Sequence, residues 1–198
     1  MDDTNILGAF LGAILGVACS AAFTIWHGAR ERQRETTTVA TALLTEVLLQ
    51  ADFIELISHS VRAALTSGQL QPSPAAFRET LQTALPPPPV MYNALADRIA
   101  LLGPDGVRNL IEFYGALAWL SINVNSLSIE NNSERPAIAA ALRRLQQIGQ
   151  GAAWKGGDTI RRLETMAEPS PERSAAAQRT LKMLDTCASD AYWKNPAR

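Results

Sequence analysis

The acidic and imidazole side chains of one predicted helix are the first candidates for chemistry. Asp52, Glu55 and His59 are three and four residues apart, so a helix places them on one face. Carboxylates and an imidazole at this spacing could supply part of a metal site. That face, however, points about 180° away from the apolar face of the same helix. Ligands in a helical bundle point inward, so we interpret these residues as a solvated face and predict no metal.

The rest of the chain offers no familiar catalytic motif. Neither Gly-x-Ser-x-Gly, Gly-x-Gly-x-x-Gly nor a Walker-type phosphate loop occurs, and the chain has two histidines. Cys187 has Asp185 and Asp190 nearby in sequence, and acidic neighbours disfavour a reactive thiolate. We therefore predict a protein that is not an enzyme and that uses no cofactor.

One apolar stretch organises the chain. Residues 6 to 26 read ILGAFLGAILGVACSAAFTIW and carry no charge. A helix of this length crosses a hydrocarbon core of about 30 Å. A cleaved signal peptide needs a basic N-terminal region, whereas this chain begins MDDTN, and the same lack disfavours lipoprotein cleavage before Cys19. The sequence predicts a transmembrane helix over residues 6–27, preceded by a short extracytoplasmic tail, residues 1–5.

Small residues recur every four positions within this predicted span. They are Gly8, Gly12, Gly16 and Ser20, and Thr24 continues the row. This spacing forms one stripe along a helix and allows close approach of a second membrane helix. We predict helix association through this stripe, although single-span anchors can also be rich in glycine without pairing.

The charges that flank the apolar stretch predict its orientation. Asp2 and Asp3 precede it, and three arginines follow within a charged collar, residues 28–38: Arg30, Arg32 and Arg34. Positive residues stay on the cytoplasmic side, and Trp26 suits the membrane interface. The expectation is a single-pass protein of the inner (plasma) membrane, with the N-terminus outside and the C-terminal domain in the cytoplasm.

Residues 39–198 predict a bundle of five or six helices, so the fold class is all-α. The first helix, about residues 36 to 66, carries an apolar seam at alternating spacings of four and three. Its members are Leu43, Val47, Gln50, Ile54, Ile57, Val61 and Ala64. No stretch alternates at the period of two that is typical of strands. The prolines at 86 to 89 predict a stiff connector between helices.

Later segments carry further helix signals. Ser73 and Ser170 each precede a proline that suits the first position of a helix. Residues 105 to 128 contain Tyr114 and Trp119 among many apolar residues, so we expect this helix to be the most buried. The pair at 156 and 157, Gly-Gly followed by Asp158, predicts a kink or break.

The length and net charge of the chain argue against one class of function, nucleic-acid binding. A chain of 198 residues with a net charge of −1 lacks the basic surface of a nucleic-acid-binding protein. The predicted partners are the lipid bilayer and either a second copy or another membrane protein. The leading function is a membrane-anchored scaffold or interaction subunit. A membrane-disrupting, holin-like effector is the alternative, and a helical-bundle ligand sensor or enzyme is less favoured.

Overall fold

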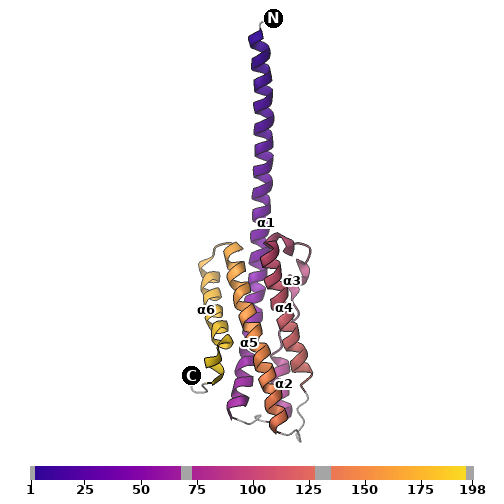
Figure 1. Ribbon diagram of the computed structural model, residues 1–198, viewed down its shortest axis with the longest axis vertical. Helices are drawn as coiled ribbons and strands as arrows, with labels where there is room; N and C mark the ends of the chain where they lie inside the picture. Colours follow the sequence, from indigo (N-terminus) through magenta and orange to yellow (C-terminus); the bar gives the residue numbers. More distant parts are fainter. Residues whose placement is uncertain (1–2, 68–72, 128–134, 195–198) are drawn as a thin grey trace.

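The chain forms a bundle of helices from which one long helix projects (Figure 1). The computed structural model describes residues 3–67, 73–127 and 135–194, with side chains from residue 20 onward except those of 74, 135 and 194. Every regular element in these ranges is a helix, which confirms the all-α class. In chain order they are α1 (Asp3–Ser67), α2 (Pro74–Thr83), α3 (Val90–Ala94), the 3₁₀ helix η1 (Ile99–Leu102), α4 (Gly103–Asn125), α5 (Arg135–Met166), α6 (Pro171–Ala188) and α7 (Asp190–Lys194).

Helix α1 is continuous over 65 residues and passes Gly28 without a break. At 1.5 Å per residue it is about 98 Å long. Its N-terminal part extends beyond the bundle, and its C-terminal part packs against the other helices (Figure 1). Phe23, Ile25 and Trp26 are exposed on the projecting part, whereas Val39 and Ala40 are buried where α1 enters the bundle.

The predicted membrane span receives no support from the described residues. Among them, no helix is long and apolar enough to cross a bilayer. Most of the predicted span, including Gly8, Gly12 and Gly16, belongs to residues 1–19, whose side chains lie outside the described set.

The predicted seam of α1 forms the centre of the core. Leu43, Val47, Ile54, Ile57 and Val61 are almost fully buried. Helix α5 lies against α1, α4 and α6, so it connects most of the bundle (Figure 1). The two predicted serine caps are also confirmed: the hydroxyl of Ser73 accepts from Ala76 N at 3.2 Å, and that of Ser170 from Arg173 N at 3.5 Å.

The expectation for α4 was wrong on one face. Phe113, Leu117 and Leu120 are buried as expected, but Trp119 is half exposed. Helix α4 contacts α5, η1 and α2, and the Arg144 guanidinium of α5, 6.0 Å from the centre of the Trp119 ring, leaves half of that side chain exposed. An apolar helix is therefore buried all round only where neighbours surround it.

The break predicted in α5 was also wrong. Helix α5 continues through Gly156 and Gly157. A Cβ at Gly156 would lie 3.1 Å from Phe113 Cε2 and 3.2 Å from Leu184 Cδ1. This glycine thus lets α4 and α6 approach α5 closely, so close packing explains it better than the predicted break does.

Candidate functional site: a groove along α1

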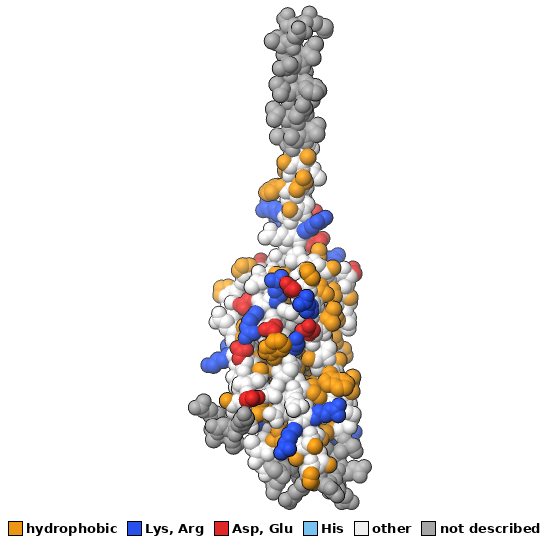
Figure 2. Space-filling view, viewed as in Figure 1, with side chains coloured by type: hydrophobic (Ala, Val, Ile, Leu, Met, Phe, Trp, Pro, Cys, Tyr) orange, Lys and Arg blue, Asp and Glu red, His pale blue; other side chains and the backbone are white. Residues whose placement is uncertain are grey.

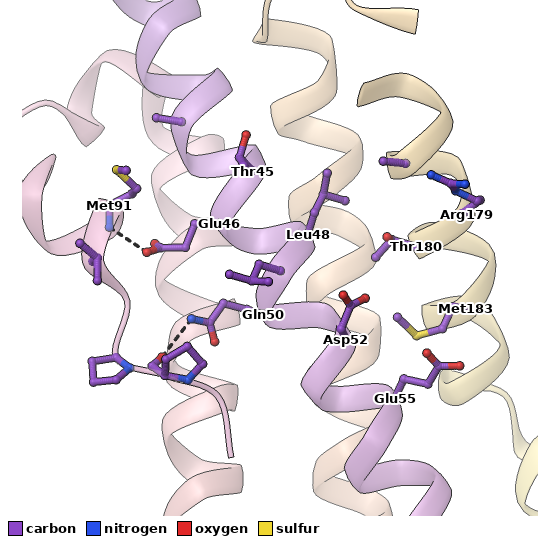
Figure 3. A pocket seen from close by; sticks show the side chains of 16 residues that line it. Thr45, Glu46, Leu48, Gln50, Asp52, Glu55, Met91, Arg179, Thr180 and Met183 are labelled. Carbon is purple, nitrogen blue, oxygen red and sulfur yellow. Dashed lines mark hydrogen bonds between the residues drawn. The ribbon is translucent and has the colours of Figure 1, made fainter. Parts of the chain in front are cut away.

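A groove runs along the bundle part of α1 and has a volume of about 950 Å³. We call it the α1 groove. Its floor is α1 between residues 42 and 55, one wall is the connector at residues 87–91, and the other is α6 between residues 176 and 183. Figure 3 shows the two walls on opposite sides of α1.

The connector wall is held in place by two side chains of α1. Gln50 Nε2 donates a hydrogen bond to the carbonyl oxygen of Pro87 at 3.0 Å. One turn earlier, the Glu46 carboxylate accepts from the backbone N–H groups of Met91, at 2.7 Å, and Tyr92, at 3.0 Å (Figure 3 shows the bond to Met91). These bonds fix the end of the proline segment and the start of α3 against α1, and so they position this wall of the groove.

Glu46 also caps α3. That helix has no capping side chain of its own, and its first N–H groups need acceptors. A carboxylate at a helix N-terminus is further favoured by the helix dipole. The third partner of Glu46 is the Tyr114 hydroxyl, which donates to it at 2.6 Å. Burial raises the pKa of Tyr114, and the carboxylate beside it raises this pKa further, so the phenol stays protonated as a donor.

The remaining lining of the α1 groove is largely apolar. Leu49 lies on the floor and is 57% exposed, and Leu48 beside it is partly buried. Val90 and Met91 of the connector wall are exposed, and Met183 lines the opposite wall. Methionine side chains are flexible and adapt to varied apolar partners.

Three charged groups line the α1 groove without an ion-pair partner among the described residues. They are Asp52 and Glu55 on the floor and Arg179 on the α6 wall. Figure 3 shows Arg179 towards one end of α6 and Glu55 towards the other end of the groove. The groove therefore combines an apolar centre with an acidic end and a basic group.

The three acidic and imidazole residues that share a predicted face of α1 differ in whether they line the α1 groove. Asp52, Glu55 and His59 are all exposed, as expected of a solvated face. Asp52 and Glu55 line the groove, whereas His59 lies outside it. Within the described ranges, no group of three acidic, histidine or cysteine side chains could hold a metal. Leu49 was not among the predicted site residues, although an apolar residue on this polar face that recurs at Leu56, seven positions later, was a usable signal.

Cys187 is inert for a different reason than we expected. The carboxylate of Asp185 lies 2.8 Å from Arg161 Nη2, and burial is the main influence on the thiol. Burial and the nearby Glu55 raise the pKa of Cys187 from 9.0 to about 11. The thiol is therefore protonated at neutral pH.

The described part of the predicted membrane interface has an aromatic and basic character. Trp26 is exposed, and the Arg30 guanidinium lies 5.4 Å from the centre of its ring. Arg32, Arg34 and Ser20 are also exposed on the projecting part of α1. The structure does not bring these residues to the α1 groove, so the chain carries two separate regions of interest.

Comparison of the chain with known protein families, characterised proteins and solved structures gives no match.

Proposed function

We propose that this protein is a membrane-anchored, non-enzymatic interaction subunit whose α1 groove binds an amphipathic helix of a partner protein. The observation that carries the proposal is the continuity of α1. One 65-residue helix joins the apolar segment at residues 6–26 to the floor of the groove. A protein built in this way holds its binding surface at a set distance from its anchor.

The anchor half of the proposal rests on the sequence. Residues 6–26 have the length and composition of a membrane span, and the small residues Gly8, Gly12, Gly16 and Ser20 would let two spans pair. Trp26 with Arg30 over its ring suits the interface of a cytoplasmic leaflet. In this arrangement the N-terminus lies outside the inner membrane and the bundle lies in the cytoplasm.

The shape of the α1 groove supports a helix as its ligand. From Ala42 to Glu55 the floor extends about 20 Å at 1.5 Å per residue. An open, elongated apolar groove of this length accommodates the apolar face of a helix of about 13 residues.

The charges support a partner with basic residues at one end. Asp52 and Glu55 lack an ion-pair partner among the described residues, so lysine or arginine on the incoming helix would complement them. An acidic residue near the other end would face Arg179. Charge complementarity of this kind also speeds association.

Site-specific photo-crosslinking in intact membranes tests the groove. A photoreactive amino acid replaces Leu49 in the full-length chain, and mass spectrometry identifies the crosslinked peptide. We expect one product, formed with a helical segment of a second protein that carries lysine or arginine beside its apolar face. The same probe at Gly151, which is exposed on α5, is the control and should give no such product.

Charge reversal makes the test specific. Asp52→Lys combined with Glu55→Lys should reduce the crosslink at least tenfold, because the basic end of the partner would meet like charges. A crosslink to lipid, to a small molecule or to the chain itself would refute the proposed ligand, as would a product that the charge reversal leaves unchanged.

A further inference from the structure

Helix α4 exposes an apolar stripe on the surface of the bundle. The stripe consists of Ile111, Gly115, Ala118, Trp119 and Ile122, and Ile111, Trp119 and Ile122 are 53%, 50% and 56% exposed. In Figure 2 hydrophobic side chains follow this edge of the bundle, whereas the face over α5 is rich in charge. Contiguous apolar surface of this kind indicates a contact with another molecule more often than isolated exposed residues do.

The glycine at the centre of the stripe has open space beside it among the described residues. A Cβ added at Gly115 would meet nothing within 4 Å, so no neighbour in the bundle requires a glycine there. Glycine inside a helix costs about 0.5–1 kcal/mol relative to alanine. A helix that approaches from outside would use the space that Gly115 leaves, together with that of Ala118 one turn away.

The charges around the stripe favour a copy of the same chain as the partner. In a parallel contact about a two-fold axis, each residue meets its own counterpart, so a charge within it would meet a like charge. The stripe itself carries no charge. The charged residues described at its edges are engaged within the chain: Glu112 is bonded to Lys155, and Arg108 Nη2 lies 3.8 Å from Asp105 Oδ1. The Arg144 guanidinium of α5 lies 6.0 Å from the centre of the Trp119 ring, beside the stripe and not within it. The α1 groove, in which Asp52 and Glu55 have no ion-pair partner within the described part of the chain, suits a different molecule.

We propose that this stripe is the contact between two copies of the protein, with their α4 helices parallel. Ile111, Gly115, Ala118 and Ile122 alternate at spacings of four and three, which is the spacing of a two-helix seam. The small pair would lie at the centre, where the backbones come closest, with isoleucine at both ends. Trp119 lies beside the seam and would be covered by it, and buried tryptophans contribute strongly to interfaces.

The parallel direction rests on the proposed membrane anchor, because two chains in one membrane must extend their α1 helices the same way. The seam has isoleucine at both ends and two small residues between them, so it is nearly the same from either end of the helix. An antiparallel pair of α4 helices is therefore the alternative. At position 111 the two arrangements differ: parallel helices bring the two copies together, whereas antiparallel helices paired about the stripe's centre separate them by about 16 Å along the axis.

A disulfide at this position tests the contact locally, even if the membrane spans also associate. The full-length chain carries Cys19→Ser and Ile111→Cys, and buried Cys187 stays protonated. Mild oxidation should produce a covalent dimer. Adding Gly115→Arg should reduce the dimer at least tenfold, because it places a long charged side chain in the contact at a position where a Cβ meets nothing within 4 Å. Gly151→Arg, at an equally open helical glycine on α5, should leave the dimer unchanged.

Other results would overturn the α4 contact, its parallel direction or the membrane anchor. No dimer from Ile111→Cys, or an equal yield with Gly115→Arg, would refute the α4 contact. A dimer that forms only between co-expressed Ile111→Cys and Ile122→Cys chains would refute the parallel direction. Membrane flotation of the same samples separates this proposal from the anchor: a chain that crosslinks but does not float with membranes contradicts the anchor alone.

Discussion

At the scale of single residues, Glu46 shows what the sequence could not reveal. It is the one charged residue between positions 36 and 51 of α1, and its three donors lie 45, 46 and 68 residues further along the chain. Helical periodicity relates residues three or four apart, so it carries no information about such distant partners. The groove residues Asp52 and Glu55 were singled out from the sequence, but the two walls beside them come from distant segments of the chain.

Removing the Glu46 carboxylate should destabilise the bundle. Glu46→Leu leaves the N–H groups of Met91 and Tyr92 and the Tyr114 hydroxyl without their acceptor. Buried donors without partners cost about 1–3 kcal/mol each, so we expect the free energy of unfolding to fall by about 3 kcal/mol. Chemical denaturation of the full-length chain in mild detergent, followed by circular dichroism, measures this change.

Two further variants show whether the loss comes from those hydrogen bonds. Tyr114→Phe removes one donor and should cost about 1 kcal/mol. Glu55→Leu, at an exposed position of the same helix, should change stability by less than about 0.5 kcal/mol. Equal losses for Glu46→Leu and Glu55→Leu would contradict the role assigned to Glu46.

At the scale of elements, local signals predicted helices well and their surroundings less well. The α1 seam and the caps at Ser73 and Ser170 depend on residues within a few positions of each other, and all were confirmed. Burial of Trp119 depends on whether a neighbour covers that face of α4, which spacing along one helix does not determine. Gly156 could not be interpreted from the sequence for a related reason: glycine is favoured both where a helix breaks and where two helices pack closely.

Two glycines of α5 should respond to alanine in opposite directions. Gly156→Ala places a methyl group within 3.2 Å of Phe113 and Leu184, so those side chains must shift. Overpacking of this kind should lower the free energy of unfolding by about 1–3 kcal/mol. Gly151→Ala meets open space and should raise it by about 0.5–1 kcal/mol, because alanine loses less conformational freedom in a helix. Chemical denaturation measures both, and stabilisation by Gly156→Ala would contradict the packing role.

At the scale of the whole molecule, α1 has an exposed part that projects from the bundle and a buried part that belongs to its core. Residues 20–35 of this helix are almost entirely exposed, whereas its residues from Val39 onward contribute to the core. No proline interrupts residues 3–67, which is compatible with one continuous helix, and the predicted seam indicated where the bundle begins. The apolar N-terminal segment was the strongest signal in the sequence, and most of its side chains lie outside the described set.

Deleting residues 1–28 should therefore separate anchoring from folding. Every core residue of the described bundle lies beyond the deletion, beginning at Val39, so the shortened chain should remain helical and unfold cooperatively by circular dichroism. It should also stay at the bottom of a flotation gradient, whereas the full-length chain rises with membranes. An unfolded product would show that the projecting part of α1 is needed for the bundle, and flotation of the shortened chain would place the anchor elsewhere.

A reporter fused after Arg198 gives the direction of the anchor in the same cells. The arginines of the collar follow the apolar stretch and aspartates precede it, so the bundle should lie on the cytoplasmic side. An enzyme that is active only outside the cytoplasm should then be silent in the fusion. Replacing Arg30, Arg32 and Arg34 by glutamate removes the charge asymmetry and should raise its activity, whereas Arg143→Glu with Arg144→Glu, on α5 far from the collar, should not. Strong activity in the unaltered fusion would reverse the orientation and place the α1 groove among extracytoplasmic partners.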